Sequence, residues 1–291
     1  MLSHAAIGML LYAGAYLSPG DTLLEVRAGD RLVIRDFRGT VVVDSWDRDQ
    51  LRARIDTKEA RGFVVRRSGG AVELALEEGA HPERREDLWL TLPRWMDLEL
   101  SGRELEAEVR GLDGDVVVWN QRGDLVFADL AGALEARSVD GSIEARALVG
   151  SARLRTGDEE IRVSASTAVL DLESVDGDME LRGIRSERIS ARSTDGDLTF
   201  SGDLLEGGDY GFFSHGGDIT LQIVGPAHFE ASVLSYSGKF ESEFPVRTSG
   251  FHSGENLDFT VGSGGARVVV ETFSGPVRLM RGPTGDGDMD G

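Results

Sequence analysis

The chain has 291 residues, of which 40% are apolar and 38 are glycine; it is therefore long and apolar enough to bury a core and is not an intrinsically disordered chain. Its 51 acidic and 31 basic residues give a net charge of −20, which argues against nucleic acid and anionic membrane surfaces as partners, because both attract clustered positive charge. The absence of cysteine excludes disulfides, thiolate metal sites and a cysteine nucleophile.

The first feature along the chain is an apolar run, AAIGMLLYAGAYL, at residues 5–17. It has the length of a signal-peptide core, and Ala13-Gly14-Ala15 fits the small-x-small cleavage pattern, although no Lys or Arg precedes the run. The run is shorter than the ~20 residues that a membrane span needs, and no other stretch approaches that length. We expect residues 1–20 to be the signal peptide of a periplasmic or cell-surface protein; the alternative is an apolar cap in a cytoplasmic one.

Residues 21–108 predict an N-terminal β segment that caps the fold. Valine-rich runs punctuated by glycine occupy residues 26–56, and the apolar–polar alternation of strands resumes over residues 87–110. The intervening EEGAHPERRED (77–87) predicts an exposed loop, because it is almost entirely charged or small.

Large aromatic side chains are concentrated in the N-terminal part of the chain. We expect these rings to close the first end of the fold; a sugar- or protein-binding patch is the alternative, because aromatic anchors dominate interfaces. The residues are Trp46, Trp89, Trp95, Trp119, Phe37, Phe63 and Phe127.

From residue 109 to 280 the chain repeats a short phrase, in which a glycine precedes an apolar-x-apolar triplet. The interval is first nine residues and later about twenty. Nine residues hold one strand and one turn but not a helix with its connection, and glycine with a flanking Asp or Ser suits the turn. The predicted turn glycines are Gly114, Gly123, Gly141, Gly177, Gly196, Gly217 and Gly238, with Gly132 and Gly150 in the same series.

Strands this short cannot each bury a face alone, so they must stack on copies of themselves. The near-constant interval favours an all-β, parallel β-solenoid (β-helix-like) of short strands with Gly-Asp turns over an antiparallel sandwich, whose loops vary in length. The solenoid is expected over residues 109–280, and the acidic, glycine-rich residues 281–291 are expected to form a flexible tail.

The sequence resembles the bacterial "putative adhesin" family of β-strand-repeat proteins, which is named for a domain of unknown function. The resemblance lies in GTVVVDSWDRDQLRAR (39–54), LTLPRWMDLEL (90–100) and the serial glycine–aspartate units after residue 111. It covers residues 26–280 and implies a β-solenoid-like fold in an exported or cell-envelope setting, with adhesion as the implied activity.

Paired aspartates around the turn glycines raise the question of a metal. Carboxylates in equivalent turns of stacked coils could act together as calcium ligands. Asp in a turn already has a structural reason, however, because it hydrogen-bonds nearby backbone. We expect no cofactor and keep calcium as the alternative; its candidate ligands are Asp113, Asp115, Asp176, Asp178, Asp195 and Asp197.

No motif predicts catalysis. The histidines His4, His81, His215, His228 and His252 form no metal-binding spacing, and no nucleophile elbow or phosphate loop lies between a strand and a helix. Arg182, Arg185, Arg188 and Arg192 beside acidic turns could line a cleft for an acidic polysaccharide, but alternating charges are more typical of the solvated face of a strand.

We therefore expect no enzyme but an exported or cell-envelope interaction module, adhesin-like, with an envelope protein or a glycan as its partner. A self-assembling, bactofilin-like scaffold and a polysaccharide-active β-helix enzyme are the alternatives. The oligomeric state is left open between a monomer and an end-to-end assembly.

Overall fold

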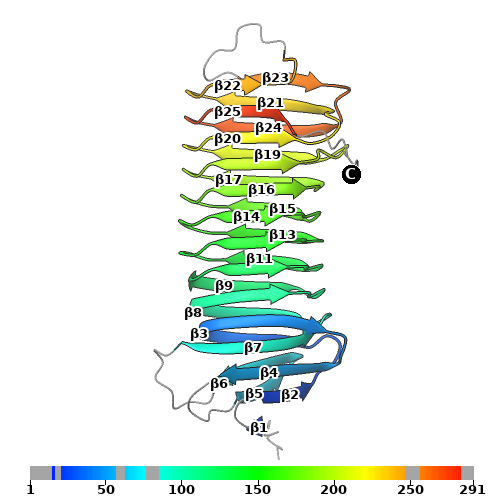
Figure 1. The fold of residues 1–291 in the computed structure, drawn as a ribbon, viewed down its shortest axis with the longest axis vertical. Helices are drawn as coiled ribbons and strands as arrows, with labels where there is room; N and C mark the ends of the chain where they lie inside the picture. Colours follow the sequence, from blue (N-terminus) through cyan, green and yellow to red (C-terminus); the bar gives the residue numbers. More distant parts are fainter. Residues whose placement is uncertain (1–14, 17–20, 57–62, 77–84, 247–255, 283–291) are drawn as a thin grey trace, which may run out of the picture.

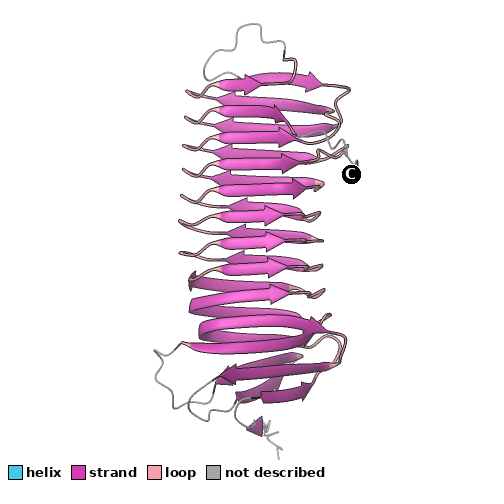
Figure 2. Ribbon diagram, viewed as in Figure 1, coloured by secondary structure: helices cyan, strands magenta, loops and turns pink. Residues whose placement is uncertain are grey.

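The computed structural model of the chain describes residues 15–16, 21–56, 63–76, 85–246 and 256–282. Every regular element in these residues is a β-strand, and the strands stack along one long axis (Figures 1 and 2). None of the described residues forms a helix long and apolar enough to cross a membrane. The predicted signal peptide, apart from Ala15 and Tyr16, most of the predicted loop, and the tail beyond Gly282 lie outside the described residues.

The first eight strands build the N-terminal end of the stack. They are β1 (Ala15–Tyr16), β2 (Asp21–Glu25), β3 (Arg31–Trp46), β4 (Gln50–Asp56), β5 (Phe63–Ser68), β6 (Ala71–Leu76), β7 (Glu86–Pro93) and β8 (Asp97–Arg110). β3 and β8 are long because each pairs on both sides of the stack. β3 bends at Asp36, whose φ is 53°, and so passes from one side of the stack to the other.

The remaining strands form two rows. The first row contains, in spatial order, β9 (Val116–Arg122), β11 (Ala133–Arg137), β13 (Ser151–Arg155), β15 (Val169–Glu173), β17 (Arg188–Ser193), β19 (Asp209–Ser214), β24 (Ala266–Thr272), β21 (Phe229–Ser235) and β23 (Asn256–Val261). The second row contains β10 (Leu125–Ala128), β12 (Ile143–Arg146), β14 (Ile161–Ser164), β16 (Met179–Ile184), β18 (Leu198–Gly202), β20 (Ile219–Ile223), β25 (Val277–Arg281) and β22 (Phe240–Ser242).

Through the body of the molecule each strand pairs in parallel with the strand two places further along the chain. One coil, which we define as one strand from each row, therefore lies directly on the next. Leu125, Ile143 and Ile161 share one register in successive coils. The step along the chain is slightly longer further on, where Leu198 pairs with Ile219. The predicted all-β fold of short stacked strands is confirmed, and its architecture is solenoid-like.

The hydrophobic core lies between the two rows. Side chains alternate in and out along each strand, as in β12, where Ile143 and Ala145 are buried and Glu144 and Arg146 are exposed. The core is continuous from Val26 to Leu279. Since each strand buries one face only, the stability of a coil depends on its neighbours above and below.

At the N-terminal end, the order of the strands in space departs from their order in sequence. β3 pairs in parallel with β8 on one side and with β6 and β7 on the other. Antiparallel strands then cover the outer coil, because β4 pairs with β7, β2 with β4, and β5 with β6. The parallel stack ends at this antiparallel cap.

The C-terminal end contains a similar inversion. β24 pairs in parallel with both β19 and β21, and β25 with both β20 and β22. The last coil of the chain is thus inserted between two coils that precede it in sequence (Figure 1). β23 pairs antiparallel with the outer edge of β21 and caps the first row.

Candidate functional site

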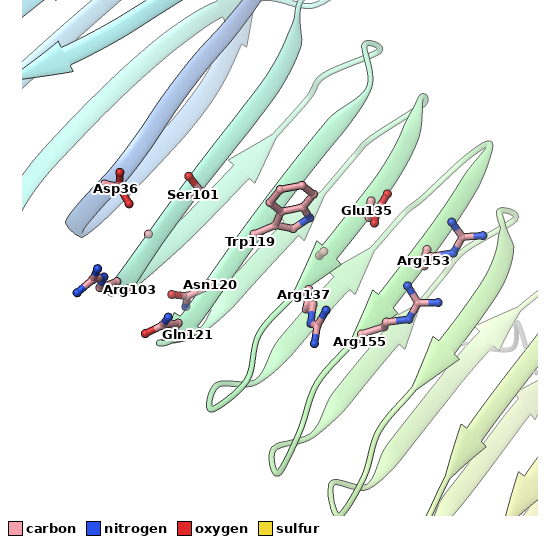
Figure 3. Close-up of a pocket in the computed structure, with 12 residues that line it drawn as sticks. Asp36, Ser101, Arg103, Trp119, Asn120, Gln121, Glu135, Arg137, Arg153 and Arg155 are labelled. Carbon is pink, nitrogen blue, oxygen red and sulfur yellow. The ribbon is translucent and has the colours of Figure 1, made fainter.

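A hollow of about 530 Å³ opens on the outer face of the first row, over β8, β9, β11 and β13 (Figure 3). It brings one large aromatic ring together with several charged side chains. Its lining includes Asp36, Arg103, Trp119, Glu135, Arg137, Arg153 and Arg155. Its lining has four arginines and two carboxylates; Arg153 and Arg155 are ion-paired with Asp171 and Glu173, which lie outside this hollow.

Trp119 faces solvent because of the two-residue period of β9. Val116 and Val118 point into the core, so Val117 and Trp119 must point outward. The Trp119 side chain is 53% exposed. An indole ring left this open on a rigid sheet is available for contact with a ligand.

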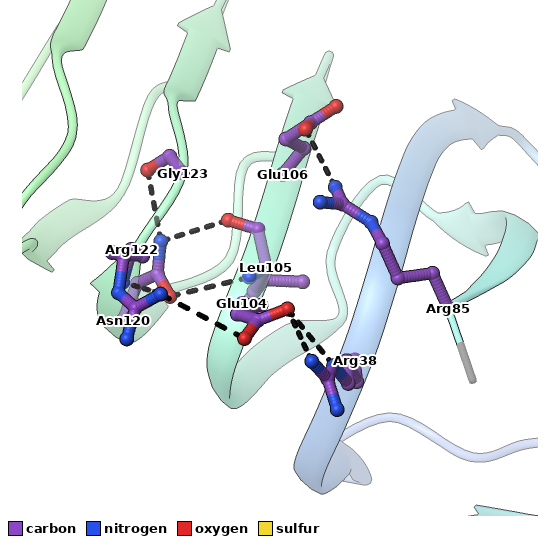
Figure 4. Close-up of polar contacts among 8 residues, drawn as sticks. All are labelled: Arg38, Arg85, Glu104, Leu105, Glu106, Asn120, Arg122 and Gly123. Carbon is purple, nitrogen blue, oxygen red and sulfur yellow. Dashed lines mark hydrogen bonds and ion pairs between the residues drawn. The ribbon is translucent and has the colours of Figure 1, made fainter. Parts of the chain in front are cut away.

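The next residue, Asn120, fixes the end of β9. Its buried Nδ2 donates to the carbonyl oxygens of Leu105 and Gly123, both at 2.8 Å, and its Oδ1 accepts the N–H of Arg122 at 3.2 Å (Figure 4). One side chain therefore ties β9 to β8 and to the turn that follows. This bonding holds the backbone beneath Trp119 in place.

Arginine side chains continue from Trp119 along the axis of the stack. Trp119, Arg137 and Arg155 occupy the same register on β9, β11 and β13. Arg155 Nε donates to Glu173 Oε2 at 2.7 Å, and this hydrogen bond is the main reason that the pKa of Arg155 is raised. Arg137 makes no ion pair with any described residue, so its guanidinium is available to a ligand.

A second hollow, of about 550 Å³, adjoins the first and shares Arg137 and Arg155 with it. It extends over β15 and β17 as far as Arg192 and Thr194. The two hollows form one elongated depression across successive coils, which we call the groove.

A network of ion pairs supports the corner between β3 and β8 beside the groove. Glu104 accepts two hydrogen bonds from Arg38, at 2.9 and 2.6 Å, and lies 3.8 Å from Arg122 (Figure 4). The hydrogen bonds from Arg38 are the largest cause of a lowered pKa at Glu104. Arg85 Nη2 donates to Glu106 at 2.6 Å on the same strand. These contacts fix the bend in β8 from which Arg103 projects.

The groove arginines were not singled out by the sequence patterns. The signal was present, because ALEAR (133–137) and SARLR (151–155) both alternate and pair in register, which places Arg137 and Arg155 on one outer column. Arg137 and Arg155 are 18 residues apart, and the residue 18 positions before Arg137 is Trp119. This spacing would have located the column.

All seven predicted turn glycines lie between strands, but mostly for a different reason from the expected one. Only Gly123 among them has a positive φ, 109°. At Gly196 a Cβ would overlap the carbonyl oxygen of Gly177, and at Gly217 it would overlap that of Gly196. The turns of successive coils are in such close contact that most of these positions need the absence of a side chain rather than an unusual backbone angle.

The serine of the repeated S-x-D-G phrase closes the turn. Ser193 Oγ accepts the N–H of Gly196 at 2.9 Å, and Ser174 and Gly177 repeat this bond at 3.0 Å. The same contact recurs from Ser214 and Ser235 and, with a threonine, from Thr272.

The aspartates that follow the glycines join one coil to the next. Asp178 Oδ1 accepts the N–H of Asp197, and Asp197 Oδ1 accepts that of Asp218, both at 2.8 Å. Asp115 accepts the N–H of Ala133 at 2.9 Å, and Asp113 pairs with Arg94 at 3.2 Å. Asp176 and Asp195 are exposed. No group of three or more acidic or histidine side chains in the described residues is arranged to hold a metal ion.

The arginines considered for a catalytic cleft do not converge on one site. Arg182 belongs to the second row, where it pairs with Glu180, whereas Arg188 and Arg192 belong to the first row. Arg192 lies over the ring of Phe213, 5.0 Å from its centroid. The two rows face opposite sides of the molecule, so the sequence cluster is not a spatial cluster.

Two of the five histidines are described. His215 stacks on Phe273 with ring centroids 4.8 Å apart, and His228 Nδ1 accepts the N–H of Ser263 at 3.1 Å. His4, His81 and His252 lie outside the described residues.

The aromatic residues expected to close the first end divide into two groups. Phe37, Phe63 and Phe127 are buried in the core. The tryptophans instead lie toward the surface: Trp46 donates to Gln50 O at 2.6 Å, Trp95 to Asp49 at 3.3 Å, and Trp89 lies under Arg54. The outer coil is closed by antiparallel strands and not by tryptophan rings.

Comparison with solved structures finds proteins of similar extent but low identity. A "putative adhesin" from Bacteroides fragilis is 11% identical over 89% of this chain and 96% of its own, with a TM-score of 0.42. A "putative adhesin" from Parabacteroides merdae is 9% identical over 89% of this chain and 95% of its own, also with a TM-score of 0.42. No curated protein matches the chain.

A family model provides the assignment. The model described as Toastrack DUF4097 matches residues 30–280, which include nearly all of the stacked strands. This match agrees with the resemblance seen in the glycine–aspartate units and the valine-rich N-terminal stretch. The chain belongs to the Toastrack DUF4097 family.

Proposed function

We propose that the protein is a non-enzymatic binding module of the cell envelope or cell surface, adhesin-like, which holds its ligand in the groove. The observation that carries the proposal is the exposed Trp119 beside Arg137, which has no ion pair within the described part of the chain, in a hollow on a rigid strand stack. Tryptophan and arginine are the residues most enriched at binding hot spots.

The rigidity of the groove supports binding. Its floor is formed by strands that are hydrogen-bonded on both sides and packed on a continuous core. A preorganised surface loses little conformational freedom when a ligand binds, so more of the contact energy appears as affinity.

The non-enzymatic part of the proposal is supported by the roles of the conspicuous acidic side chains. Asp115, Asp178 and Asp197 accept backbone N–H groups from the next coil. A carboxylate that accepts these backbone hydrogen bonds stabilises the stack, whereas a general acid or base must reach a reacting group.

Export is supported by the apolar run at residues 5–17 and its small-residue cleavage pattern. Fractionation of the native cell, followed by N-terminal sequencing of the mature protein, tests this part separately. A protein found in the cytoplasm with its first residues intact would contradict it.

Replacing the exposed indole tests the groove itself. A panel of purified neutral and acidic polysaccharides and the solubilised envelope fraction would be titrated against the protein and against Trp119→Ala by calorimetry. We expect the variant to bind about tenfold more weakly, because loss of an aromatic anchor removes more than about 1 kcal/mol.

Tyr236→Ala is the matched control, because Tyr236 is equally exposed, at 50%, and lies at the far end of the stack. Both variants should retain the thermal unfolding midpoint of the parent. A ligand whose affinity is unchanged by Trp119→Ala binds elsewhere, and absence of binding across the whole panel removes the proposed function.

A further inference from the structure

We propose that the ligand of the groove is an extended acidic polysaccharide, which lies along the axis of the stack with a sugar ring on Trp119 and its carboxylates on the column that begins with Arg137. This inference rests on the proposed function and names the class of ligand for the same site.

The shape of the groove indicates a chain rather than a compact molecule. The two hollows are joined through Arg137 and Arg155 and together extend from Ser101 on β8 to Thr194 beyond β17. The groove therefore crosses five first-row strands at right angles to their direction. A ligand that fills it must be elongated and must run from coil to coil.

The arginines of the groove that have no ion pair among the described residues indicate an anion. Five arginines and three carboxylates line it: Arg103, Arg137, Arg153, Arg155 and Arg192 against Asp36, Glu135 and Glu173. Arg155 is engaged by Glu173 and Arg153 by Asp171, at 2.7 and 3.0 Å, and Arg192 lies 4.0 Å from Asp171. Arg103 and Arg137 have no ion-pair partner among the described residues, so a bound carboxylate could reach them without breaking an existing pair.

The net charge of −20 does not prevent this contact. Charges elsewhere on the stack act through water and are screened beyond about 8 Å at physiological ionic strength. A guanidinium forms paired hydrogen bonds with a carboxylate at short range, which gives the local contact both strength and direction. Recognition then depends on the groove and not on the overall field.

The spacing of the coils suits a chain of sugar units. Successive strands are ~4.8 Å apart, so equivalent side chains recur along the groove at that distance. A β-linked pyranose unit in an extended chain advances by a similar length, so a sugar chain that lies in the groove passes about one unit per coil.

Trp119 adds a flat apolar surface at one end of the column. The face of a pyranose ring carries C–H groups, and the face of an exposed indole offers a matching flat apolar area. The ring at Trp119 and the guanidinium at Arg137 are one coil apart, so one chain of sugars could contact both.

The experiment compares three probes that differ in one property each. Oligomers of β-linked mannuronic acid carry the charge, their methyl esters keep the chain without the charge, and poly-L-glutamate keeps the charge on a peptide. Calorimetry would measure each against the parent, Arg137→Gln and Arg146→Gln. Arg146 is the matched control, because it is exposed on the second row and also lacks an ion pair among the described residues.

We expect the acidic oligomers to bind at least tenfold more tightly than their esters, and Arg137→Gln to remove about tenfold of that affinity while Arg146→Gln leaves it unchanged. Equal binding of the esters, with sensitivity to Trp119→Ala retained, would overturn the acidic ligand but keep the proposed function. Equal or tighter binding of poly-L-glutamate would overturn the polysaccharide. Absence of binding by the acidic oligomers would overturn the inference outright.

Discussion

At Gly196 the chain passes the preceding turn at a distance that no side chain could occupy. A Cβ there would overlap the carbonyl oxygen of Gly177. Because the same contact repeats at Gly217 against Gly196, the turns on this side of the molecule form a column of backbone stacked on backbone. Glycine therefore recurs at this position in the sequence because the turns of successive coils lie so close together.

Substitution of Gly196 by alanine tests this contact. We expect Gly196→Ala to lower the free energy of unfolding by about 3 kcal/mol, because the backbone of two buried turns must separate to admit the methyl group. Gly207→Ala is the control, since Gly207 has a φ of 74° and open space around it; it should lower that free energy by only about 1 kcal/mol. Chemical denaturation measures both. A loss at Gly196→Ala no larger than that at Gly207→Ala would contradict the role of the contact.

The positions of the turn residues could be predicted from the sequence, but their contacts could not. Spacing alone placed Gly177 and Gly196 between strands. The hydrogen bond from Asp197 N–H to Asp178, by contrast, joins two turns and depends on the register of two coils. Trp119 shows the same division: its outward direction follows from alternation in VVVWNQR, whereas the hollow around it depends on neighbours from β8, β11 and β13.

At the scale of the strands, the repeated phrase predicts a strand and a turn, but it does not predict which neighbours that strand has in the stack. ARVVVET in β24 alternates like any other strand, and nothing in it predicts pairing between β19 and β21. The parallel body could therefore be predicted, because each coil follows its predecessor. The inverted order of the strands at both ends could not be predicted, because several strands with the same alternating pattern could pair there equally well.

The inverted order of the C-terminal strands predicts how the protein responds when the chain is shortened from its C-terminal end. β21 pairs only with β23 and β24 among the described strands, and β22 only with β25. In a chain that ends at residue 265, the amide protons of β21, β22 and β23 should therefore lose their protection, because β24 and β25, which hold these strands to the stack, are missing. Hydrogen exchange with mass spectrometry measures this loss. A chain ending at residue 228 is the control, and residues 116–193 should stay protected in both; protected β21, β22 and β23 in the first chain would contradict the pairing.

At the scale of the whole molecule, the ends of the stack bear on the scaffold alternative. End-to-end assembly of solenoids needs an open parallel coil at each end. Here β4 and β5 pair antiparallel at the N-terminal end, and β23 does so on the first row at the C-terminal end. Antiparallel strands thus cover the N-terminal end and the first row of the C-terminal end, which favours a binding module over a filament.

We accordingly expect a monomer at every concentration. Size-exclusion chromatography with light scattering, over a hundredfold range of protein concentration, should give a constant mass close to 31.4 kDa, less any cleaved signal peptide. Mass that rises with concentration, or filaments in negative-stain images, would restore the scaffold.

The inserted coil of β24 and β25 also bears on how the protein is made. As the chain folds, the rod can grow coil by coil only as far as β20, because β21 and β22 have no parallel partner among the described strands until β24 and β25 are present. Strands made earlier therefore wait for strands made later, and a copy cut short before β24 would keep an unfinished end.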